Sequence, residues 1–139
     1  MRIDVLLLLS LLSACSHTPA ITARTEYFNE GYLASSRIET PDPCRTCFNG
    51  QQIVMNWNLQ TRCLPATIVL SVRYGNHEFD EVVHEVNAPA GFWIFRLLNQ
   101  EYWDRQGILS YSVRLYSGET LISAWNHHLW AEQIYIEGV

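Results

Sequence analysis

The sequence predicts an all-β fold, a single antiparallel β-sandwich of seven or eight short strands. Apolar and polar residues alternate in short stretches, as they do in half-buried strands. Turn-forming Gly, Pro and Asn residues separate these stretches at short intervals. Beyond the first segment, no long stretch has the apolar spacing of a helix. The chain of 139 residues is long enough for one domain.

The first half of the chain predicts four strands in order. Residues 25–38 are strand-like, and a proline-containing loop at 40–43 follows them. Alternation over 51–59 places Ile53, Met55, Trp57 and Leu59 on one face. Residues 67–74 repeat this pattern. After the turn signal at Gly75-Asn76, residues 79–86 form the returning strand.

The second half predicts the remaining strands and one helical turn. Residues 92–98 are nearly all apolar, which predicts a strand buried on both faces. The polar stretch 99–105 predicts a turn of helix that ends at Gly107. Apolar and polar residues alternate most clearly over 109–115, which predicts a strand. Residues 120–136 supply one long or two short final strands.

Two short patterns narrow the kind of sandwich. Tyr111-Ser112-Val113 resembles the Tyr-x-Cys step of immunoglobulin strand F, with Val at the Cys position. Ile53-x-Met55-x-Trp57 is similar to the early Trp-bearing strand of fibronectin type III domains. These resemblances imply an immunoglobulin or fibronectin type III-like sandwich across 51–136. In such folds the Tyr hydroxyl ties down a nearby loop.

The N-terminal segment has a composition of its own. Its apolar run at 5–12 is too short to span a bilayer as a helix and fits the core of a secretory signal. Leu12-Ser13-Ala14-Cys15 resembles the bacterial lipobox at every position. That resemblance implies cleavage before Cys15 and attachment of lipid to its thiol. Residues 1–14 would then be the signal peptide, 15–24 a lipidated tether and 25–139 the sandwich domain.

The same resemblance implies a location. At least two acyl chains on Cys15 give a stable membrane anchor, whereas one gives reversible binding. Ser16, in place of Asp, follows the cysteine, which by the sorting rule of some lipoproteins indicates the outer membrane. We therefore expect a lipid-anchored protein of the cell envelope, with the lipid membrane as one partner.

Charge argues against nucleic acid as a partner. The net charge is −5, and all nine basic residues are arginines spread singly along the chain. A protein that follows a phosphate backbone needs basic residues gathered in a stripe or patch.

The sequence contains no enzyme signature. It lacks a Gly-x-Ser-x-Gly elbow and a glycine-rich phosphate loop, and it indicates no cofactor. The histidines are interpreted as solvated or hydrogen-bonded side chains. An alternative is a small metal-dependent hydrolase that uses His77, His84 and the nearby acids Asp80, Glu81 and Glu85.

Three cysteines remain after Cys15. Cys44 and Cys47 are spaced as the ends of a β-turn, so a disulfide between them is favoured over any bridge to Cys63, although all three thiols reduced is an open alternative. Neighbouring prolines and a following strand argue against a redox-active helix N-terminus. Cys63 is expected to be a free, buried thiol.

Aromatic residues that have polar neighbours in the sequence are the candidates for a partner surface. Most of the large aromatics are expected in the core, but some sit beside polar residues, as exposed interface aromatics do. The candidates are Tyr102, Trp103, Trp125, His127, His128 and Trp130. The leading hypothesis is a non-enzymatic module that binds or helps to assemble another envelope protein.

Overall fold

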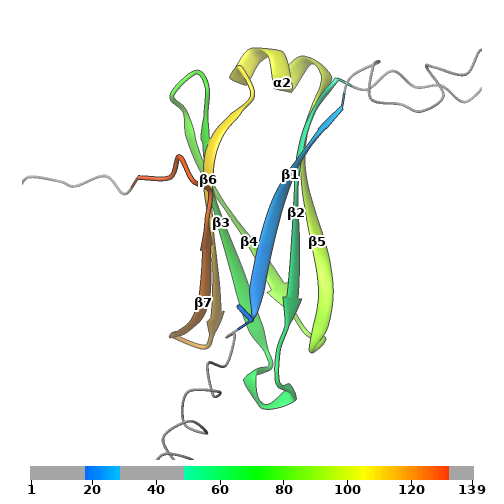
Figure 1. Cartoon of the computed structure of the whole chain (residues 1–139), viewed down its shortest axis with the longest axis vertical. Coiled ribbons are helices and arrows are strands. Elements are labelled where there is room, and N and C mark those ends of the chain that lie inside the picture. Colours follow the sequence, from blue (N-terminus) through cyan, green and yellow to red (C-terminus); the bar gives the residue numbers. More distant parts are fainter. Residues whose placement is uncertain (1–17, 29–48, 132–139) are drawn as a thin grey trace, which may run out of the picture.

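A computed structural model describes residues 18–28 and 49–131 (Figure 1). The expected signal peptide, the lipidation site Cys15 and the pair Cys44 and Cys47 lie outside these residues. The described elements are β1 (Ile21–Phe28), β2 (Gly50–Asn58), the 3-10 turn η2 (Thr61–Cys63), β3 (Ala66–Tyr74), β4 (Phe79–Val86), β5 (Ala90–Leu98), α2 (Asn99–Arg105), β6 (Ile108–Ser117) and β7 (Thr120–Asn126).

The seven strands form two antiparallel sheets, which confirms the predicted all-β sandwich. One sheet has the order β1-β2-β5 and the other β4-β3-β6-β7 (Figure 1). The constant-type immunoglobulin arrangement pairs the fourth strand with the fifth. Here β4 pairs with β3 instead, so it belongs to the larger sheet, as it does in fibronectin type III domains.

The core lies between the two sheets and follows the predicted alternation. On β3, and over residues 111–115 of β6, every second side chain points inward and is buried, because the facing sheet covers it. The residues with no exposed surface include Ile21, Ile53, Met55, Ile68, Leu70, Val72, Leu97, Val113 and Leu115. The predicted faces of 51–59 and 67–74 are therefore confirmed.

The first strand begins four residues earlier than expected. Residues 21–24 were assigned to the tether, but β1 starts at Ile21, which pairs with Trp57 and is completely buried. Residues 16–24 look tether-like in the sequence because most are small or polar, yet Ile21 and Ala23 pack in the core. The expected tether would therefore have to end before Ile21.

The expectation that residues 92–98 are buried on both faces is wrong. Strand β5 is an edge strand of the three-stranded sheet, and only one of its faces meets the core. Phe92 on its outer face is 66% exposed.

Gly91 is the place where the core requires a small residue, since the Trp57 ring would lie 2.7 Å from a Cβ there. Trp57 itself is buried, and its indole N–H donates to the Ala88 carbonyl at 3.1 Å.

Among the residues that the structure describes, the Tyr111 hydroxyl bonds a strand of the facing sheet, whereas the strand F resemblance implied a loop. Tyr111 lies on the inner face of β6 and is 2% exposed. Its hydroxyl accepts a hydrogen bond of 3.4 Å from the Thr25 hydroxyl on β1, so it links the two sheets.

Helix α2 connects β5 to β6 across one end of the sandwich (Figure 1). Its C-terminus closes with Gln106 and Gly107, both at positive φ. Tyr102 packs against the core from the helix, and the buried Gln51 side chain accepts the Ile108 backbone N–H at 2.6 Å. The helical turn expected at 99–105 is thus confirmed. In the residues described here, no helix is long and apolar enough to cross a membrane.

Candidate binding surface

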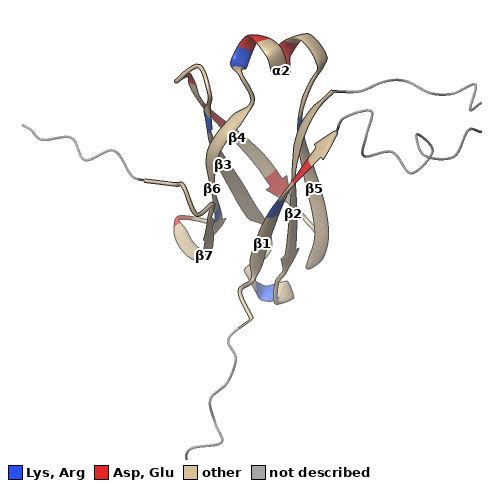
Figure 2. Cartoon of the chain, turned by 45° about the horizontal axis from the view of Figure 1, so that its top comes forward, with Lys and Arg blue, Asp and Glu red and all other residues tan. Residues whose placement is uncertain are grey.

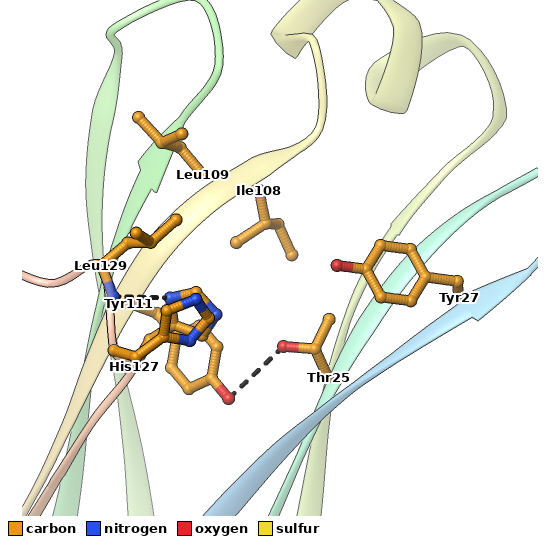
Figure 3. Close-up of a pocket in the computed structure, with 8 residues that line it drawn as sticks. Thr25, Tyr27, Ile108, Leu109, Tyr111, His127 and Leu129 are labelled. Atoms are coloured by element: carbon orange, nitrogen blue, oxygen red, sulfur yellow. Dashed lines mark hydrogen bonds between the residues drawn. The ribbon is translucent and has the colours of Figure 1, made fainter.

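A hollow of about 310 Å³ opens between the two sheets where β1 separates from β6 (Figure 3). Thr25 and Tyr27 of β1 form one wall. The start of β6 and the segment after β7 form the other, with Tyr111 at the base. The lining residues are Thr25, Tyr27, Ile108, Leu109, Tyr111, His127, His128 and Leu129.

The hollow exists because inward-facing positions extend beyond the region where the sheets meet. Tyr27 has the same parity along β1 as the core residues Ile21 and Ala23, and Ile108 pairs with the inward Tyr74 across a register shift in β6, so both side chains point toward the opposite sheet. No described residue covers them fully. Tyr27 is 54% exposed, Leu109 44% and Leu129 57%. Three large apolar side chains therefore surround an open space.

Polar groups lie at the base of the hollow. The His127 ring lies 5.2 Å from the Tyr111 ring and 4.1 Å from the His128 ring, measured between centroids. His127 Nδ1 accepts the Leu129 backbone N–H at 3.3 Å, which leaves Nε2 for another partner. Burial, and next the neighbouring His128, lower the pKa of His127, which favours its neutral form. Burial also raises the pKa of Tyr111.

The structure separates the predicted aromatic candidates into several places. His127 and His128 lie together at the hollow. Tyr102 and Trp103 sit on α2, where Trp103 is 61% exposed. Trp125 points inward from β7 and packs against the core. They do not form one continuous surface.

Trp130 lies on the outer face of the larger sheet. Its ring contacts Phe79 at 6.5 Å between centroids, and the Arg73 guanidinium lies 5.1 Å from the ring centroid. Arg73 also donates to the Ala131 carbonyl at 3.3 Å. Trp130 thus holds the segment after β7 against the sheet, which is a structural role.

The histidines of the alternative hydrolase are not brought together. His77 is exposed in the turn before β4, whereas His84 lies near the end of β4 and stacks on Trp93 at 4.7 Å between centroids. Asp80 accepts hydrogen bonds from Tyr74 and Arg105, and Glu81 from Arg114 and Ser71. Within residues 18–28 and 49–131, no group of three or more His, Cys, Asp or Glu residues could hold a metal ion.

Cys63 has a free thiol, as expected, but it is half-exposed rather than buried. It borders a second, shallower hollow of about 500 Å³ at the end of the sandwich where the N-terminal residues enter. Thr18, Pro19 and Ala20 line this space together with Leu59 and Ile122.

The first hollow combines apolar walls with polar side chains at its base. Its lining includes three hydroxyl groups and two imidazoles, and no carboxylate of the described residues lines it. Basic residues are spread over the elements rather than gathered on one face (Figure 2). Comparison of the chain with protein-family models, curated proteins and solved structures finds no match.

Proposed function

We propose that the chain is a lipid-anchored lipoprotein of the bacterial envelope that binds another envelope protein through the hollow beside β1. The observation that carries the proposal is the set of half-exposed apolar side chains on both walls, Tyr27, Leu109 and Leu129. Exposed apolar side chains gathered around polar groups are characteristic of protein-binding sites.

The openness of the hollow favours a macromolecule over a small ligand. Small-molecule sites enclose most of the ligand surface within apolar walls. Here the walls themselves remain about half exposed, so they would become buried only under a surface larger than the hollow. The imidazole of His127, whose Nε2 is left free by the hydrogen bond at Nδ1, would supply a polar contact at its base.

The anchor leaves this surface accessible. Cys15 precedes Ile21 by six residues, so the lipid lies within about 20 Å of the start of β1. The hollow involves Thr25 and Tyr27 in the second half of the same strand, away from that start. A partner in the envelope could therefore reach it while the protein stays on the membrane.

Affinity recovery of the anchored chain from bacterial membranes tests the proposal. Leu109→Asp places a charge in the hollow and should reduce recovery of the specific partner at least about tenfold, the effect of losing a central apolar contact. Leu121→Asp is the matched control, since Leu121 is 50% exposed on β7 and does not line the hollow.

Cys15→Ser removes the proposed lipid site. Its recovery of the partner shows whether recognition needs the membrane anchor. If no specific protein is recovered with the anchored chain, or if Leu109→Asp and Leu121→Asp lose it equally, the proposal fails. Deletion of the gene distinguishes an accessory role from simple binding. If the lipoprotein stabilises an envelope complex, that complex should be lost in the deletion strain.

A further inference from the structure

Strand β5 has one edge that no strand of the described chain covers. It pairs only with β2. The β2–β5 ladder continues at both ends, where Leu59 N–H donates to the Pro89 carbonyl at 2.6 Å and Asn99 N–H to the Asn49 carbonyl at 2.7 Å. Odd-numbered β5 residues therefore direct their backbone groups toward β2, and even-numbered residues direct theirs to the free edge.

The residues at this free edge are almost entirely apolar. Their side chains lie on the outer face of the sheet, because they alternate with the inward Trp93, Phe95 and Leu97. They are Ala90, Phe92, Ile94, Arg96 and Leu98. Soluble proteins usually protect an exposed edge with charges, prolines or bulges. β5 has a regular register and a single charge, so its edge is open to another strand.

The corresponding edge of the other sheet is protected. The Tyr74 N–H donates to the Glu78 carbonyl at 3.0 Å, which continues the β3–β4 ladder and makes the odd-numbered residues of β4 the outward ones. Two of these four, Glu81 and Glu85, are carboxylates on the outer face. Two copies of β4 would bring four negative charges together, which disfavours pairing.

We propose that β5 pairs antiparallel with β5 of a second copy of this chain, joining two three-stranded sheets into one of six strands. A two-fold axis at Ile94 places Phe92 opposite the partner's Arg96, and Arg96 opposite the partner's Phe92. A guanidinium beside an aromatic ring is attractive, and this register sets no like charges opposite each other. The five outward N–H groups of each copy would form about ten main-chain hydrogen bonds.

This dimer is compatible with the rest of the molecule. β1 lies at the opposite edge of the same sheet, so the hollow stays open in both copies. Phe92, which is 66% exposed, becomes covered. One strand pair is a contact at the lower end of the size range of specific interfaces, so dissociation in the micromolar range is expected.

Sedimentation equilibrium of the chain from Ser16 to Val139 tests the proposal independently of lipidation. We expect a monomer–dimer equilibrium between about 1 and 200 µM. Ile94→Lys places two like charges at the axis while its aliphatic stem still covers Val54, the residue opposite Ile94 on β2. It should weaken dimerisation at least about tenfold. Val83→Lys is the matched control, because Val83 is an outward residue of β4 and is 60% exposed.

A mixing experiment guards against misfolding of the variant. Ile94→Lys and Ile94→Glu should each be monomeric alone and should form a heterodimer when mixed, since opposite charges then meet at the axis. A wild-type chain that stays monomeric at the highest concentration overturns the proposal. So does a dimer that Ile94→Lys leaves intact, a dimer that Val83→Lys disrupts equally, or a mixture that stays monomeric.

Discussion

His127 connects the end of β7 to the base of the hollow. Its backbone N–H donates to the Tyr111 carbonyl at 3.0 Å, and its ring lies against the Tyr111 ring. The ring is partly buried between Tyr111 and His128, which makes its protonated form less stable than in the unfolded chain. The protonation state of this one side chain is therefore coupled to the stability of the surface.

We predict that His127 makes the domain less stable in mild acid. Its pKa is about 6.5 in an unfolded chain and lower in the folded protein, so below pH 6.5 the unfolded state binds more protons. The stability contributed by neutral His127 is present above that pH and is lost as pH falls through the folded pKa. Urea unfolding should show a smaller decline between pH 7.5 and 5.5 in His127→Phe, which keeps a ring beside Tyr111.

His77→Asn is the control for the other titrating groups. His77 is exposed in the turn at φ 70°, a conformation that Asn accepts readily. The stability of the His77→Asn variant should decline with falling pH as the stability of the wild type does. If His127→Phe and the wild type decline in parallel, the assigned coupling is wrong.

Individual residues of the hollow show what alternation reveals and what it does not. Alternation placed Leu109 on the same face as Tyr111, but a register shift in the β3–β6 ladder sets Ile108 opposite the inward Tyr74 and leaves Leu109 44% exposed. Alternation also could not show that β1 diverges near the start of β6 (Figure 3), because this depends on the opposite sheet. Tyr27 and Leu129 were missed for the same reason. His127 and His128 were singled out as candidates in the sequence, and both line the hollow.

At the scale of elements, Arg105 is one of the residues that hold α2 onto the sandwich, together with Tyr102, which packs against the core. Arg105 Nη1 lies 2.6 Å from the Asp80 carboxylate on β4, and its guanidinium lies 4.4 Å from the centroid of the Tyr74 ring. Glu78 and Glu101 add longer contacts of 3.6 Å. This cluster joins the helix to the β3–β4 turn, two elements that the sequence places some 25 residues apart.

Removal of this arginine should loosen the helix. We predict that Arg105→Met, which keeps the aliphatic stem, lowers the free energy of unfolding by about 1–2 kcal/mol, a charged hydrogen bond reduced by its partial exposure. Hydrogen exchange in α2 should accelerate more than in β3. Arg24→Met is the matched control, since its 2.9 Å ion pair with Glu26 is exposed, and it should change stability by less than about 0.5 kcal/mol. Equal effects of the two variants would contradict the assignment.

Strand existence was predictable, but strand position in the sheet was not. Residues 51–59 and 67–74 were assigned correctly because one face of each meets the core and the other is more polar. Residues 92–98 were expected to be buried on both faces because they are nearly all apolar, yet β5 is an edge strand with an exposed outer face. An apolar sequence indicates burial, but it does not say whether a strand is buried within its own fold or against a second chain. The proposed dimer would account for the apolar residues of β5 by the second alternative.

At the scale of the whole molecule, three surfaces lie in different places. The hollow is beside β1, the open edge is at β5, and the N-terminal residues enter at the end that holds Cys63. An antiparallel β5 pair reverses one copy relative to the other, so the two N-terminal ends lie at opposite ends of the dimer. With a reach of about 20 Å each, both anchors could enter one membrane when the strands lie roughly parallel to it.

The anchor itself makes a chemical prediction. If Leu12-Ser13-Ala14-Cys15 is a lipobox, the mature protein begins at Cys15, and mass spectrometry of its N-terminal peptide should show attached acyl chains. Cys15→Ser should remain unprocessed, because the modified thiol is the group that lipoprotein peptidase requires. Cys63→Ser is the control and should be processed normally, since Cys63 lies within the sandwich domain. A mature chain that starts elsewhere and is free in the periplasm would refute the anchor, and the dimer would stand independently.

The residue after the cysteine decides the last prediction, which concerns the membrane that holds the protein. Ser16 indicates the outer membrane by the sorting rule of lipoproteins that resemble this chain, and Asp at that position indicates the inner one. Ser16→Asp should therefore move the protein from the outer to the inner membrane fraction in a sucrose gradient while leaving acylation of Cys15 unchanged. The substitution lies two residues before the described chain and five before β1, so the fold and the β5 edge should be unaffected. Recovery of the partner should then fall if the partner resides in the outer membrane, whereas Ser16→Thr should change neither location nor binding. A wild-type protein already in the inner membrane would contradict the expected location without affecting the proposed binding surface.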